Sequence, residues 1–147
     1  MAQQDFNFFD SIRVRWAEVD LQAIVFNGNY LTYFDVAFTE YWRMTNLQSP
    51  LEQSKAGLEM FAKKASIEFH APARFDDILK VGVRCSELGR TSMKFAIEIF
   101  KEDEHLVSGE MIYVYADSQI RKSVAVPENW RQRFIDIEKP NSIKINS

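Results

Sequence analysis

Two carboxylates, Glu18 and Asp20, precede the longest amphipathic helical pattern in the chain, which begins just after Asn27. The first turn of a helix has backbone N–H groups without helical partners and carries the positive end of the helix dipole. Beside a carboxylate, such a turn can take part in chemistry on a carbonyl. By residue type alone, however, loop carboxylates more often complement the dipole, and Asn27 has a simple interpretation as the helix cap.

Other kinds of catalytic site have no signature in the chain. There is no glycine-rich phosphate loop, no serine in a nucleophile-elbow pattern and no CxxC pair. His70 and His105 are far apart in sequence and lack metal-ligand spacing. The single cysteine, Cys85, falls on the apolar side of an alternating segment, which is typical of a small buried residue. We therefore expect no metal site and no cofactor.

Composition and charge restrict the class of protein. The 147 residues, 46% hydrophobic and 27% charged, predict one globular domain spanning 1–147. A net charge of -3 gives no long-range attraction for phosphate backbones, so nucleic acid is not an expected partner. The N-terminal segment lacks the pattern of a signal peptide, and no apolar run approaches the roughly 20 residues that span a bilayer. We expect a cytoplasmic protein without a membrane span.

Periodicity predicts the elements that would position the carboxylates. The expected elements are a strand over 10–16, a long helix over 30–44, a short helical turn over 51–56, strands over 61–69, 79–85, 93–99 and 107–115, and a terminal helix that begins at Pro127. The connections at 88–90 and 101–105 are short, so the strands that they join should form an antiparallel meander. This order is α+β, with one central helix to cover the sheet.

The second face of this sheet is predicted to be partly apolar. Phe100, Ile112 and Val114 fall on the parity opposite to the main apolar series of their strands. An apolar face that the single helix does not cover favours assembly with a second copy of the chain.

The run from Glu18 to Leu31, EVDLQAIVFNGNYL, followed by Tyr33-Phe34-Asp35 and Ala37, resembles the signature of the 4-hydroxybenzoyl-CoA thioesterase-like group of hotdog-fold proteins. The segments 74–77 and 89–92 resemble features of the same group at strand ends. The resemblance covers a core of about 10–137. It implies a hotdog fold, in which a curved antiparallel sheet of about five strands wraps around one long central helix and a C-terminal helix follows. It also implies a homodimer or homotetramer with active sites between subunits.

The resemblance assigns roles residue by residue. Asp20 matches the catalytic carboxylate, which attacks the thioester or activates water, and Asn27 falls on a turn position that is His or Asn in many members. Gly28, Asn29 and Tyr30 match the helix start, whose N–H groups polarise the thioester carbonyl. Because CoA carries phosphates, Lys63, Arg74 and Arg90 are candidate CoA-binding residues, although each is equally well explained as an ordinary surface cation.

Two features leave the assignment open. Where the family usually has Gly and often His after the acid, the chain has Ala23 and Ile24, which could reshape the acyl pocket or lower catalysis. Glu18 could also hold the role given to Asp20. The leading hypothesis is an acyl-CoA thioesterase that releases a free acid and CoA. The alternatives are a non-catalytic acyl- or CoA-binding hotdog protein and an acyl-carrier-protein thioesterase. The acyl preference is not predicted.

Overall fold

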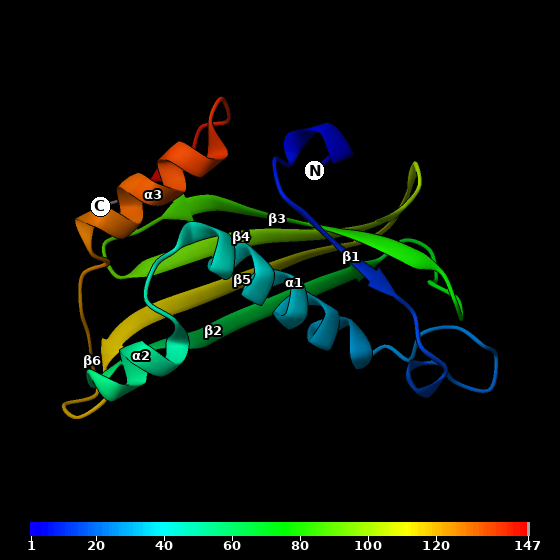
Figure 1. Cartoon of the computed structure of the whole chain (residues 1–147), viewed down its shortest axis with the longest axis horizontal. Helices are drawn as coiled ribbons and strands as arrows, with labels where there is room; N and C mark the ends of the chain where they lie inside the picture. Colours follow the sequence, from blue (N-terminus) through cyan, green and yellow to red (C-terminus); the bar gives the residue numbers. More distant parts are fainter. Residues whose placement is uncertain (147) are drawn as a thin grey trace.

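The fold is a curved antiparallel sheet with one long helix packed across it (Figure 1). The computed structural model describes residues 1–146. Its strands are β1 (Phe9–Arg13), β2 (Leu58–Phe69), β3 (Ile78–Leu88), β4 (Ser92–Lys101), β5 (Glu104–Asp117), β6 (Lys122–Ser123) and β7 (Lys144–Ile145), and its helices are α1 (Asn29–Thr45), α2 (Pro50–Lys55) and α3 (Glu128–Glu138), with 3-10 turns η1 (Gln3–Asp5) and η2 (Trp16–Glu18). Within this part of the chain, no helix is long and apolar enough to cross a membrane.

The strand order along the sheet is β1-β3-β4-β5-β2. The strands β3, β4 and β5 form the antiparallel meander that their short connections predicted. The long strand β2 pairs with β5 rather than with β3, which follows it in sequence. The two-residue strands β6 and β7 pair with β5 and β3. Five strands curved around α1, followed by α3, confirm the predicted α+β hotdog fold.

The central helix is positioned by a buried aromatic face. Tyr33, Phe34, Ala37 and Tyr41 are each at most 2% exposed, and their spacing places them on the side of α1 that meets the sheet. Gly109 in β5 makes the close approach possible, because a Cβ atom at that position would collide with the Phe34 ring. The aromatic periodicity therefore predicted both the helix and the face that it buries.

Two local predictions at the start of the chain are wrong. The first strand ends at Arg13, because the chain turns into η2 at Trp16. The side chain of Trp16 is 68% exposed and does not face the core. The cap of α1 is Gly28, with no side-chain hydrogen bond at the cap, so Asn27 does not cap the helix. Both corrections concern the connection that contains the two carboxylates.

The outer face of the sheet is partly covered by the chain itself. Phe100 is 2% exposed and packs against Phe6 and Phe9, which precede and begin β1. Ile112 and Val114 are only partly buried on the same sheet. The apolar side chain of Phe100 thus needs no second subunit to leave water.

A buried carboxylate fastens α3 to the core. The Oε2 atom of Glu138 accepts hydrogen bonds from the Tyr41 hydroxyl at 2.6 Å and from the Cys85 backbone N–H at 2.9 Å. Glu138 is fully buried, and this burial raises the pKa of its carboxyl. Cys85 is fully buried as predicted, and burial likewise raises the pKa of its thiol, which keeps it in the unreactive protonated form.

Candidate active site

Glu18 anchors the loop that leads to α1. Its side chain is almost buried, and Oε1 accepts hydrogen bonds from the Arg15 backbone N–H at 2.8 Å and the Tyr33 hydroxyl at 2.9 Å. The Arg15 guanidinium donates to Oε2 at 2.6 Å. The backbone oxygen of Glu18 accepts from Phe26 N–H at 3.0 Å and Asn29 Nδ2 at 2.8 Å. Because its oxygens are occupied from both sides of the loop, Glu18 holds the loop in place.

These contacts also keep Glu18 ionised. Burial acts to raise the pKa of its carboxyl, but the hydrogen bonds from Arg15 and Tyr33 outweigh burial, and the pKa lies below its ordinary value. A fixed carboxylate that is already engaged by three donor groups is poorly placed to attack a substrate or to accept its proton. Of the two candidate acids, Glu18 is therefore the one whose contacts favour a positioning role.

Asp20 lies on a tight hairpin between Glu18 and the helix. Val19 and Val25 form an antiparallel bridge, the Asp20 N–H donates to Ile24 O at 2.9 Å, and Oδ1 of Asp20 accepts from the Gln22 N–H at 2.8 Å. Asp20 is exposed, and its Oδ2 accepts no hydrogen bond from residues 1–146. The backbone of Asp20 is thus fixed while one of its carboxylate oxygens remains available to a ligand.

Ala23 lies in the turn of this hairpin, where the resemblance predicts glycine. Its φ is 61°, in the left-handed region that favours glycine, and its N–H donates to Asp20 O at 2.9 Å. For a residue with a Cβ atom this conformation costs about 1–2 kcal/mol. The glycine expected here from the resemblance has a conformational reason, and the chain keeps the turn despite the alanine. The turn beside Asp20 is therefore formed with alanine at this position.

The Gly28 N–H at the start of α1 is an unpaired backbone donor among residues 1–146. The Asn29 N–H donates to Phe26 O at 2.9 Å and the Tyr30 N–H to Asn27 O at 3.3 Å. The N–H of Gly28, the N-cap residue, donates to no acceptor within residues 1–146. The side chain of Asn27 is exposed. Of the three amides that sequence assigned to carbonyl polarisation, that of Gly28 is the one left free by the protein.

A second segment, residues 73–75, clamps the hairpin and the helix start together. The Val25 N–H donates to Ala73 O at 2.9 Å, and the Ala73 N–H donates to the Tyr30 hydroxyl at 3.2 Å. The Phe75 N–H donates to Ala23 O at 3.0 Å. Sequence reasoning missed this clamp because it joins the ends of β2 and β3 to the first loop. The only feature of the sequence near the helix that belongs to this clamp is the hydroxyl of Tyr30.

The predicted CoA-binding cations do not meet within one chain. Arg74 lies beside the hairpin, where it forms a bridge with Ile24. Arg90 lies beyond the opposite end of β3, whose 11 residues extend over about 36 Å. Lys63 lies in β2, beside Lys64 and Lys94 around a groove of about 350 Å³. Only Arg74 is joined to the loop that carries Asp20.

Comparison with known families decides the class of this protein. The model of the Thioesterase superfamily matches residues 22–108, which begin two residues after Asp20 and include the second half of the hairpin, α1 and the strands β2 to β4. The chain belongs to the thioesterase superfamily. This membership confirms the predicted class of enzyme, a thioester hydrolase, and the family resemblance on which that prediction rested.

Individual relatives of this thioesterase support the assignment. It is 35% identical over 92 residues to a putative esterase of Aquifex aeolicus, covering 62% of this chain and 70% of that protein. It is 25% identical over 130 residues to the acyl-CoA thioesterase YbgC of Haemophilus influenzae, covering 88% and 96%. The crystal structure of a 1,4-dihydroxy-2-naphthoyl-CoA thioesterase from Synechocystis superimposes with a TM-score of 0.84 at 22% identity, covering 90% and 98%. At that identity the likeness shows the shared fold.

Proposed function

We propose that this thioesterase hydrolyses acyl-CoA thioesters to a free acid and CoA, with Asp20 as the catalytic carboxylate and the Gly28 N–H as a donor to the carbonyl oxygen. The observation that carries this proposal is the exposed Asp20, whose Oδ2 has no hydrogen-bond partner in the described part of the chain, on a hairpin tied through Glu18 to the start of α1. The names of its relatives in Haemophilus and Synechocystis support CoA as the carrier of the acyl group.

Two routes fit this arrangement. In the first, an Asp20 oxygen attacks the carbonyl carbon, the C–S bond breaks, the CoA thiolate leaves and takes up a proton, and water then hydrolyses the mixed anhydride. In the second, Asp20 accepts a proton from water while the resulting hydroxide attacks the same carbon and the thiolate leaves. In both, negative charge develops on the carbonyl oxygen. A fixed backbone donor such as Gly28 N–H stabilises it, and the loss of one such donor typically costs on the order of 3 kcal/mol.

The test is hydrolysis of a panel of short-chain, long-chain and aromatic acyl-CoA substrates by the wild type and by Asp20→Asn. We expect the variant to lose about a hundredfold or more in kcat. Asp103→Asn, which changes an exposed acid in the turn between β4 and β5, is the matched control and should retain full activity. Full activity of Asp20→Asn would overturn the site assignment.

The same panel separates the alternative functions. Binding of a non-hydrolysable acyl-CoA analogue together with no turnover of any thioester would identify a binding protein instead. Faster hydrolysis of the same acyl group on an acyl carrier protein than on CoA would identify the carrier-protein thioesterase.

We further propose that a second copy of the chain completes the site in a homodimer or homotetramer. The strand β2 pairs with β5 on one side, and among residues 1–146 no strand pairs with its other edge. Phe61 and Phe69 on this strand are 47% and 51% exposed, and next to Asp20 the side chain of Leu21 is fully exposed. Free strand edges and exposed apolar side chains favour association. Light scattering on the purified protein tests this proposal, and a monomer at assay concentration would contradict it.

A further inference from the structure

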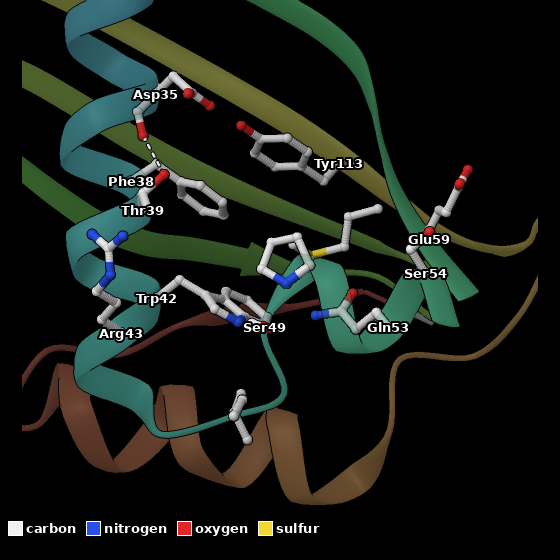
Figure 2. Close-up of a pocket in the computed structure, with 13 residues that line it drawn as sticks. Asp35, Phe38, Thr39, Trp42, Arg43, Ser49, Gln53, Ser54, Glu59 and Tyr113 are labelled. Atoms are coloured by element: carbon white, nitrogen blue, oxygen red, sulfur yellow. Dashed lines mark hydrogen bonds between the residues drawn. The ribbon is translucent and has the colours of Figure 1, made fainter. Parts of the chain in front are cut away.

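A pocket of about 480 Å³ lies beside the C-terminal half of α1, under α2 and the start of β2 (Figure 2). Three aromatic side chains form much of its wall, namely Phe38, Trp42 and Tyr113. The rings of Phe38 and Tyr113 stack with their centroids 4.8 Å apart, and Trp42 is fixed by donation from Nε1 to Gln48 O at 2.8 Å. The pocket therefore has a rigid apolar wall and the volume of a small-molecule site.

One polar group in this wall has an unused hydrogen-bonding atom. Gln53 of α2 is 1% exposed, and its Nε2 donates to Gln48 O at 2.7 Å. This donation fixes the orientation of the amide, and Oε1 is buried without a hydrogen-bond partner within residues 1–146. Figure 2 shows the side chain of Gln53 extending from α2 toward Ser49 and Trp42. A buried acceptor without a partner is unfavourable, and a ligand donor that displaces the side chains covering Oε1 would satisfy it.

The charges around the pocket select against an anionic group. The carboxylates of Asp35 and Glu59 line it, whereas Arg43 is paired with Glu40. Burial and the nearby charge of Asp35 raise the pKa of Tyr113 to about 12, so its hydroxyl stays neutral at physiological pH. The apolar wall in turn disfavours a buried ammonium group. The matching ligand has an apolar body and a neutral hydrogen-bond donor, such as a hydroxyl.

One face of α1 runs from the start of the helix to the pocket. Leu31, Asp35, Phe38 and Trp42 follow one another at intervals of four, three and four residues along α1. Leu31 in the first turn is 45% exposed, and Asp35 lies six residues beyond Asn29, about 9 Å along the axis. A group held at the helix start can thus extend along this face and reach the aromatic wall.

We propose that the pocket takes the distal part of the acyl group of the substrate, and that Gln53 favours acyl groups with a hydroxyl near their far end. This inference rests on the proposed function, because it assumes that the thioester lies at the start of α1. It assigns Gln53 as a residue that determines specificity, remote from the bond that breaks.

The first experiment measures binding without turnover. The probes are non-hydrolysable thioether analogues of straight-chain acyl-CoA, matched in length and prepared with and without a terminal hydroxyl. At the best length, the wild-type protein should bind the hydroxylated analogue about tenfold more tightly, the effect of one satisfied hydrogen bond. Gln53→Leu should lose this preference. Equal affinities of the wild type for the two analogues at every length, or the same preference in Gln53→Leu, would overturn the role of Gln53.

A second pair of variants tests the pocket without changing Gln53. Its result therefore does not depend on whether Gln53→Leu folds. Ser54→Phe places a ring in the pocket from an exposed position of α2, while Lys55→Phe places the same ring one residue away, outside the pocket lining. Ser54→Phe should weaken binding of long analogues at least tenfold and that of short ones little, and Lys55→Phe should weaken neither. Equal effects of the two variants would overturn the placement of the acyl group. Failure to hydrolyse any thioester would overturn the proposed function alone, because these measurements need no turnover.

Discussion

The hydroxyl of Tyr33 donates to Oε1 of Glu18 at 2.9 Å, and this bond joins the second turn of α1 to the loop that carries Asp20. Hydrogen bonds to charged groups contribute about 1.5–3 kcal/mol. Tyr33→Phe keeps the buried ring and removes the bond, so we expect the free energy of unfolding to fall by about 2 kcal/mol. Chemical denaturation measures this change. Tyr115→Phe, another core tyrosine, is the control, and an equal effect in both variants would contradict the role of the Glu18 bond.

Glu18 predicts a loss of stability in acid. Its pKa in the folded protein lies below the ordinary value of 4.5, so its stabilising contribution is present above pH 4.5 and is lost as pH falls through the folded value. Glu18→Gln should remove this part of the pH dependence and be less stable than the wild type at neutral pH. Urea unfolding between about pH 3 and pH 7 gives both curves. Parallel curves for the two proteins would show that Glu18 makes no such contribution.

For Glu138 we expect the opposite dependence of stability on pH. Burial raises its pKa in the folded protein above the ordinary 4.5, so the folded state keeps a proton that the unfolded state releases. Its contribution to stability is complete below pH 4.5 and declines as pH rises through the raised value. Glu138→Gln resembles the protonated acid and can still accept from Tyr41. The variant should therefore gain stability relative to the wild type as pH rises, which thermal unfolding at several pH values would measure. A constant difference across that range would contradict this prediction.

Ala23 offers a stabilising substitution within the site. Because its φ is 61°, Ala23→Gly should relieve backbone strain and raise the free energy of unfolding by about 0.5–1 kcal/mol, even though glycine makes the unfolded chain more flexible. Ala17→Gly, in the turn before the hairpin, lacks a positive φ and should destabilise. Denaturant titration of both variants distinguishes the two effects. A loss of stability in Ala23→Gly would contradict the strain.

Gly28→Pro removes the proposed donor. The φ of -63° at Gly28 is compatible with proline, and chemical denaturation of the variant checks that the restriction which proline places on Asn27 leaves the fold intact. We expect kcat to fall by about a hundredfold or more. Gly28→Ala keeps the N–H and is the control, because the exposed ring of Phe26 near its Cβ position can move aside. Equal kcat values for Gly28→Pro and Gly28→Ala would contradict the donor role.

The sequence predicted those features of the fold that depend on neighbouring residues, and it did not predict those that depend on contacts between distant segments. The aromatic spacing of α1 is local, and it predicted the helix to within one residue at each end. The partner of β2 is not local, because it depends on how α1 crosses the sheet, and the pattern did not predict its pairing with β5. Trp16 has the parity of a core residue but lies in a turn. Local periodicity does not contain that information.

Within the site, the pattern located the carboxylates but not their different surroundings. Glu18 and Asp20 are equivalent by residue type, and their roles separate only when Tyr33, Arg15 and Asn29 contact the first of them. The sequence pattern did not predict the pocket at Gln53 either. Over 51–56 it indicated only a short helical turn, which the structure has as α2. The residues that determine such a site come from segments that meet only in the folded chain.

The strand order has a consequence for the order of folding. The hairpins β3-β4 and β4-β5 join neighbours in sequence, whereas β1 pairs with β3 and β2 with β5 across long intervening segments. Contacts between distant segments carry a larger loop-closure entropy and form more slowly. The contacts of residues 73–75 with the hairpin of Asp20 and with Tyr30 are of this distant kind. We therefore expect the proposed site to form late in folding, after the central meander of β3, β4 and β5.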